Sequence, residues 1–213
     1  MAIWDIKERN KKARGYEIRG TRGIFAGGTT PSFSNVVDFI NIKSAGNATD
    51  FGDTTQTRNQ SVATGNDTRF VNMGGVTPTV VDTIDYTQFS STGNLADFGN
   101  LTAATRGLSA AGSNTRAIGA GGSAPGNVNV IQFFTIKSLG NAADFGDLTV
   151  AKSESTGAAS PTRACFAGGN NPGYLNNIDF ITTASAGDAA DFGDLTTVKG
   201  ELSGVSNGHG GLA

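Results

Sequence analysis

The chain has 213 residues with 31 glycines, 5 prolines and only 16% charged residues, a composition that favours short strands joined by glycine turns over helix bundles or coiled coils. The net charge of −2 provides no global basic field that would attract nucleic acid or an anionic membrane. One cysteine, Cys165, and one histidine, His209, are too few for an internal disulfide or a His/Cys zinc site.

Residues 1–20 differ from the rest of the chain in charge, with six basic residues against three acidic ones and the only tryptophan. They show neither a signal-peptide pattern nor a long apolar run, so synthesis in a cytosol is expected. One interpretation is an arm that anchors the chain to an acidic partner surface through Trp4, Lys7, Arg9, Lys11 and Lys12. The alternative is a strand that closes the fold and carries a solvated run of charge.

Residues 21–208 consist of four units of 47 residues without insertion or deletion. Thr-Arg recurs at 21, 68, 115 and 162, and Gly-Gly, a proline and Asp-Phe-Gly return at the same interval. The units occupy 21–67, 68–114, 115–161 and 162–208, followed by a short C-terminal tail, within one expected domain over 21–213. Trp4 and Lys11 stand 47 residues before Phe51 and Arg58, so residues 1–20 also resemble half a unit.

Each unit predicts β structure in the same order. TRGIFAGG is a short strand stopped by paired glycines, which permit a positive φ or a close backbone approach. NVVDFINIKS is a second strand with apolar residues on both faces, which predicts a sheet buried on both sides. A turn-rich stretch around D-F-G-D-L-T follows, and then a small-residue segment that supplies one or two further strands.

Units of this size and apolarity must stack on one another, as the blades of β-propellers and the coils of solenoids do. The 47-residue period favours an all-β propeller of four blades, because solenoid coils are shorter. A closed ring is the preferred interpretation. The alternatives are an arc that is completed by oligomerisation, because an open arc exposes apolar sheet faces, and a β-solenoid.

The order of arginine, short strand, Gly-Gly, aromatic-bearing strand, second aromatic and Leu-Thr over residues 21–208 resembles the kelch repeat. The aromatics are Phe or Tyr and are more widely spaced than in that family. The sequence motifs GIFAGG, D-F-I-N-I and G-N-A-x-D-F-G-D-L-T are also similar to repeats of marine bacteriophage tail-fibre and other virion structural proteins. These resemblances imply a propeller and a place in a virion.

Two sets of repeated polar residues are candidate sites. Asn47, Asp50 and Asp53 place oxygen ligands in a glycine-rich turn and form a weak calcium candidate, although such residues more often bond their own backbone. The fixed arginines are expected to brace each unit by pairing with a repeated Asp, such as Asp38 or the Asp-Phe-Gly aspartates, rather than to bind anionic glycans. The residues assigned to bracing are Arg22, Arg69, Arg116, Arg163, Asp50, Asp97, Asp144 and Asp191.

The sequence offers no set of catalytic residues. Asp-Phe-Gly recurs four times without any kinase loop around it, no G-x-S-x-G motif occurs, and His209 alone gives a Ser-His-Asp triad little support. We therefore expect a protein that is not an enzyme and needs no cofactor, namely a structural or adhesion module of a phage virion. Its partners would be neighbouring virion proteins or a host-surface glycan or protein, without nucleic acid or membrane insertion, and a homo-oligomer is possible.

The alternative is a standalone cytoplasmic scaffold or lectin that binds a protein or glycan. In either case the loops at 29–34, 76–80, 123–127 and 170–175, which differ most between units, are the expected binding loops.

Overall fold

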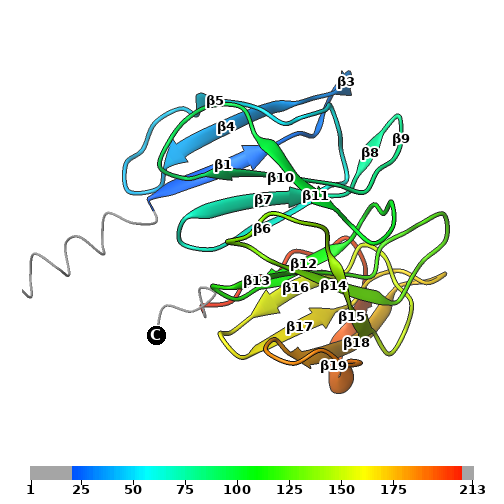
Figure 1. The fold of residues 1–213 in the computed structure, drawn as a ribbon. Coiled ribbons are helices and arrows are strands. Elements are labelled where there is room, and N and C mark those ends of the chain that lie inside the picture. The colour runs from blue at the N-terminus through cyan, green and yellow to red at the C-terminus, as the bar shows by residue number, and fades with distance from the viewer. Residues whose placement is uncertain (1–20, 208–213) are drawn as a thin grey trace, which may run out of the picture.

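The computed structural model describes residues 21–207, and these form an all-β structure without any helix. Fifteen strands belong to four antiparallel sheets, and four two-residue strands form two small hairpins. Figure 1 shows the sheets following one another in chain order, from the blue sheet of β1, β4 and β5 to the yellow and orange sheet of β16 to β19. Within the described part of the chain, no helix is long and apolar enough to cross a membrane.

The sheets are numbered here in chain order, with strands given in their spatial order. Sheet 1 contains β1 (Arg22–Ala26), β4 (Val36–Asn41) and β5 (Thr49–Asp53). Sheet 2 contains β6 (Val62–Gly65), β7 (Arg69–Met73), β10 (Thr83–Gln88) and β11 (Ala96–Asn100). Sheet 3 contains β12 (Ser109–Gly112), β13 (Arg116–Ala120), β14 (Val130–Thr135) and β15 (Ala143–Asp147). Sheet 4 contains β16 (Thr156–Ala159), β17 (Arg163–Ala167), β18 (Leu175–Thr182) and β19 (Ala190–Lys199).

The two strands expected in each unit are confirmed. In sheet 1 they are β1 and β4, which pair antiparallel with Ile24 opposite Phe39. The paired glycines end β1 for a steric reason: Gly27 has φ of 71°, and a Cβ there would lie 2.7 Å from the carbonyl oxygen of Arg58. Only glycine fits both conditions, so the turn after the first strand is the same in every unit.

The Asp-Phe-Gly stretch is a strand, where the sequence predicted a turn. It forms β5 in sheet 1 and the equivalent outer strands β11, β15 and β19. Asp and Gly are poor strand formers, but here a glycine with φ near 140° accompanies a β-bulge, and the next sheet supplies hydrogen bonds to the strand. Tertiary contacts therefore override the local propensity.

The small-residue segment supplies one strand, and that strand joins the sheet of the following unit. β6 comes from the end of the first unit and pairs with β7 of the second, with Val62 opposite Met73. β12 and β16 repeat this arrangement in sheets 3 and 4. Each of these sheets is thus built from two consecutive units, which ties neighbouring units together through the backbone.

Consecutive sheets pack face to face, and each contact is called a seam below. The forward face of a sheet is turned toward the next sheet in the chain, and the rear face toward the previous one. Three buried apolar clusters fill the seams, centred on Phe51 with Phe70, on Phe98 with Phe134, and on Phe145 with Phe166. The expectation that the sheets are buried on both faces is confirmed for sheets 2 and 3.

The inner strands β6, β12 and β16 lie side by side. Beyond β19, Ser206 donates a hydrogen bond to the carbonyl of Ala159, so the chain returns alongside β16. The antiparallel sheets differ from the parallel coils of a β-helix solenoid. The described residues form an open series, because the rear face of sheet 1 and the forward face of sheet 4 are both exposed.

Candidate interaction site

Each forward face carries the same stack of an arginine and two aromatic rings. In sheet 1, the guanidinium of Arg22 lies 4.9 Å from the ring centroid of Phe39, and this ring meets Phe51 edge-on at 5.8 Å. The stack recurs in the other three sheets at centroid distances of the same size. The second ring is the phenylalanine of Asp-Phe-Gly, which is 2–3% exposed in sheets 1 to 3.

The arginines connect consecutive sheets. Arg22 donates from Nη1 to the carbonyl of Phe89 at 2.7 Å, and Arg69 and Arg116 donate in the same way to Ile136 and Thr183 at 2.8 Å. No ion pair between these arginines and the repeated aspartates occurs among the described residues, where the sequence suggested one. Each guanidinium instead lies over an aromatic ring and, in sheets 1 to 3, donates a hydrogen bond to a carbonyl of the next sheet. Its planar shape allows both contacts.

Two seams contain a buried ion pair that crosses from one sheet to the next. Arg58 pairs with Asp85 between sheets 1 and 2, and Lys152 Nζ lies 2.8 Å from an oxygen of Asp179 between sheets 3 and 4. All four side chains are fully buried. Burial lowers the pKa of Arg58 and of Lys152 and raises the pKa of Asp85, because removing water disfavours each charged form.

The seam between sheets 2 and 3 has the neutral residues Thr105 and Gln132 in these two positions. Base and acid have been replaced together, which leaves no buried charge without a partner. A threonine binds the acid position in every seam: Thr55 Oγ1 donates to Asp85 at 2.6 Å and Thr102 Oγ1 to Gln132 at 3.1 Å, and Thr149 donates to Asp179. Sequence reasoning missed these pairs, although the joint replacement over a constant 27-residue spacing was a signal for them.

Backbone hydrogen bonds also join the sheets at their outer strands. Gly93 donates to the carbonyl of Phe51 at 2.7 Å, and Asn94 Oδ1 accepts from the backbone N–H of Asp53 at 3.1 Å. Equivalent bonds occur in the other two seams. The approach is so close that a Cβ on Gly52 would lie 2.5 Å from the backbone of Gly93, so the glycine of Asp-Phe-Gly is required by the seam.

These contacts define the surroundings of the calcium candidates. Asp50 Oδ1 accepts a hydrogen bond from the backbone N–H of Gly52 at 3.0 Å, the local backbone bond that was weighed against calcium. The residues in the position of Asn47 in sheets 2 to 4 accept bonds across the seams. Among the described residues, no group of three or more His, Cys, Asp or Glu is arranged to hold a metal ion. Calcium binding by Asn47, Asp50 and Asp53 stays a prediction.

The predicted anchoring residues and the single histidine lie outside the described residues. They are Trp4, Lys7, Arg9, Lys11, Lys12 and His209. Cys165 lies on β17 and is half-buried, and burial raises the pKa of its thiol, which leaves it a weak nucleophile.

The expected binding loops contain the hairpins β2 (Thr29–Thr30) with β3 (Ser32–Phe33) and β8 (Val76–Thr77) with β9 (Thr79–Val80). Isolated bridges close the equivalent loops of the third and fourth units. Thr29, Thr30, Pro31 and Ser32 are exposed, so the first of these loops is available for contact with a partner.

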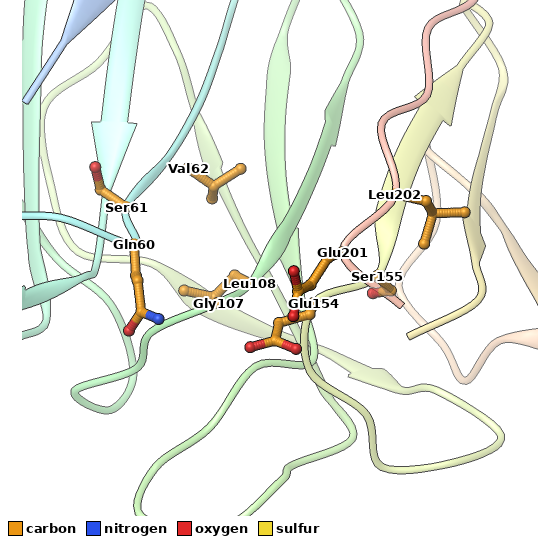
Figure 2. Close-up of a pocket in the computed structure, with 9 residues that line it drawn as sticks. All are labelled: Gln60, Ser61, Val62, Gly107, Leu108, Glu154, Ser155, Glu201 and Leu202. Atoms are coloured by element: carbon orange, nitrogen blue, oxygen red, sulfur yellow. The ribbon is translucent and has the colours of Figure 1, made fainter. Parts of the chain in front are cut away.

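A hollow of about 410 Å³ lies where the segments before the inner strands come together. Figure 2 shows Glu154 and Glu201 in this hollow, with Gln60 on the facing segment. Gln60, Glu154 and Glu201 occupy the same position in the first, third and fourth units, where Gly107 stands in the second, and all four have a positive φ between 52° and 60°. Backbone bonds link this position from unit to unit, from Gly107 to Gln60, from Glu154 to Gly107 and from Glu201 to Glu154.

The same columns that are covered inside the seams are exposed at the two ends of the series. Phe192 on the forward face of sheet 4 is 54% exposed, and Phe25 and Ile42 on the rear face of sheet 1 are 57% and 64% exposed. Lys199, which stands in the position of Arg58 and Lys152, is exposed as well. Each end face therefore carries residues equivalent to those on one side of a seam.

No protein-family model and no curated protein matches the chain.

Proposed function

We propose that the chain is a non-enzymatic structural or adhesion module, built as a segment of a kelch-like β-propeller in which each sheet is a blade. Three observations support this architecture: the 47-residue units have constant length, each supplies three strands of one sheet, and consecutive sheets meet through equivalent backbone contacts. The propeller is completed through contacts with another chain, because the end faces are apolar and uncovered.

The observation that carries the proposed function is the pair of exposed end faces. Phe192 at one end and Phe25 and Ile42 at the other are more than half exposed, although their equivalents in the seams are covered. Large exposed apolar side chains that gather on one face indicate a surface for a protein partner. The buried charged side chains Arg58, Asp85, Lys152 and Asp179 join consecutive sheets to one another, which favours an assembly role.

We place this module in a virion, where it would contact neighbouring subunits or a host surface. The similarity of the repeats to those of phage tail-fibre and virion structural proteins supports the location, and the end faces provide a means of assembly. Residues 1–20, with Trp4 and their basic side chains, would anchor the chain in the particle.

Density-gradient sedimentation of a lysate from cells that produce the protein tests this location. A virion component sediments with nuclease-resistant particles, and a variant without residues 1–20 stays at the top of the gradient. Recovery of the intact protein only at the top, as a free species, would contradict the virion proposal and favour the standalone scaffold or lectin.

The hollow of Figure 2 favours a second candidate function, the binding of a small polar ligand such as a glycan. Two carboxylates and the hydroxyls of Ser61 and Ser155 line it, and such groups bind sugar hydroxyls. A glycan array tests this candidate, with the Glu154→Gln, Glu201→Gln double variant as the control. Binding by the intact protein that the double variant lacks would support it, and equal signals from both would remove it.

A further inference from the structure

The two exposed end faces carry the two halves of one seam. We propose that a second copy of this chain docks head to tail, so that the forward face of sheet 4 in one copy covers the rear face of sheet 1 in the next. This inference rests on the proposed function as an assembly module and names the partner.

The forward face of sheet 4 already has the geometry of the faces that are covered. Arg163 lies 4.6 Å from the ring centroid of Phe180, and Phe180 meets Phe192 at 5.9 Å, as in the other three sheets. The half-buried Leu195 stands in the position of the buried Leu101 and Leu148. Because these groups keep their arrangement without a cover, docking requires little reordering of the face.

The rear face of sheet 1 offers the complementary apolar half. Phe25 stands in the position of Phe166, which is fully buried in the seam between sheets 3 and 4. Ile42 stands in the position of Ile136, which is fully buried in the seam between sheets 2 and 3. The carbonyl of Ile42 is also the equivalent of the carbonyls that accept from Arg22, Arg69 and Arg116, so it is the acceptor for Arg163 of the preceding copy.

The backbone of the two ends is complementary as well. Gly52, Gly99 and Gly146 each approach a backbone segment of the next sheet, whereas a Cβ on Gly193 would meet open space. The segment that would fill this space contains Gly46 and Asn47, which stand in the positions of Gly93 and Asn94. In the first seam, Gly93 and Asn94 form hydrogen bonds with the backbone of Phe51 and Asp53.

Charge gives the strongest reason to choose a second copy as the occupant. The base and acid positions are Arg58 with Asp85, Thr105 with Gln132, and Lys152 with Asp179, so charge is present on both sides of a seam or on neither. The ends hold Lys199 and Asp38, a base and an acid in these same two positions, neither of them fully buried. A head-to-tail contact pairs them, and Thr196 stands where Thr55 and Thr149 bind the acid.

Two other occupants compete with a second copy. Residues 1–20 place Trp4 and Lys11 in the positions of Phe192 and Lys199, so they match the rear face of sheet 1. They have no counterpart of Asp38 and therefore do not match the forward face of sheet 4. Closure within one chain would satisfy both ends, but both faces are exposed in the described structure. A second copy provides a matching surface for each of the two exposed faces.

The contact is heterologous, so the copies form a ring if the rotation between them closes and a filament if it does not. Static light scattering and sedimentation velocity on the full chain measure this association over a range of concentrations. We expect reversible association of the intact chain. Lys199→Asp should weaken it about a hundredfold, because it places two acids against each other in a buried contact. Asp38→Lys should do the same.

The two variants together provide the decisive comparison. A double variant with Lys199→Asp and Asp38→Lys should recover the affinity of the intact chain, because the pair is restored with its charges exchanged. An equimolar mixture of the two single variants should also recover association, with the two variants in alternating order, because every contact between them pairs a base with an acid. Lys137→Asp, the same charge change at an exposed lysine away from both faces, should leave association unchanged.

An intact chain that remains monomeric at all concentrations would overturn the proposal. If Lys11→Asp lowers the thermal stability of such a monomer and Asp38→Lys restores it, residues 1–20 are the occupant. If Lys199→Asp and Asp38→Lys compensate each other without association, the ring closes within one chain. These experiments use purified protein, so they can fail while the protein still sediments with particles, which separates this inference from the proposed location.

Discussion

The seams and the end faces share their residue types and differ in whether a neighbouring sheet covers them. Phe145 and Phe192 have the same position in their units and the same edge-on contact with a second ring, yet one is 3% exposed and the other 54%. The repeated sequence thus encodes the face, and only the neighbouring sheet decides its burial. We therefore expect a residue of the repeated face to stabilise the fold only where a neighbouring sheet covers it. The following variants test this expectation.

The largest difference is expected for the phenylalanine itself. Phe145→Ala removes a buried ring from a filled cluster and should lower the free energy of unfolding by about 3–5 kcal/mol. Phe192→Ala should cost less than about 1 kcal/mol at a protein concentration where the chain is monomeric. Urea denaturation of both variants measures the difference. Equal losses would show that Phe192 is covered within a single chain.

Breaking one buried ion pair should have an effect of similar size. Lys152→Met leaves the carboxylate of Asp179 buried without an opposite charge and should cost about 3–5 kcal/mol. The double variant with Asp179→Leu should recover most of this loss, as the neutral Thr105 and Gln132 of the preceding seam indicate. Thermal unfolding of the two variants tests this, and a double variant as unstable as the single one would contradict it.

The outer-strand glycines give a smaller, matched comparison. Gly146→Ala and Gly193→Ala both place a side chain at a positive φ, 141° and 132°, so both carry a backbone penalty of about 1–3 kcal/mol. Only Gly146 also has backbone atoms of Gly187 within 2.5 Å of the added Cβ. Chemical denaturation should therefore find Gly146→Ala the more destabilised of the two. The reverse order would place an unexpected neighbour at Gly193.

The smallest effect concerns the thiol of Cys165 on sheet 4. Burial raises its pKa above the ordinary value of 9.0, so the folded state favours the neutral thiol. This contribution to stability is fully present below pH 9.0 and is lost as the pH rises past the raised pKa. The rate of alkylation by iodoacetamide should keep rising above pH 9.0, because the thiolate is the reactive form. A rate that levels off below this pH would contradict the burial.

The strands and the glycine turn could be predicted from the sequence because their signals are local. β4 has a dense β-branched and aromatic pattern, and Gly27 marks a turn that needs a positive φ. β5 could not be recognised, since Asp and Gly oppose a strand and the strand is held by pairing with β4 across a β-bulge that the sequence does not reveal. The pairing of β6 with a strand of the following unit could not be predicted either. The repeated sequence does not mark where one sheet ends and the next begins.

For the candidate site, some of the residues could be predicted from the sequence, but their contacts could not. The repeated arginines were identified, but their contacts with Phe89, Ile136 and Thr183 depend on a neighbouring sheet that the sequence does not locate. The pairing of Arg58 with Asp85 spans 27 residues and becomes visible when its equivalents are compared between units. The internal repeat thus carried more information about the seams than any single motif did.

Zero-length carbodiimide crosslinking of Lys199 to Asp38 tests the central claim most directly, with mass spectrometry on an equal mixture of copies grown on ordinary and on heavy nitrogen. The account predicts a Lys199–Asp38 crosslink in which mixed-isotope pairs are as frequent as same-isotope pairs. A crosslink found only within copies of one isotope, or no crosslink at concentrations where the intact chain associates, would contradict it.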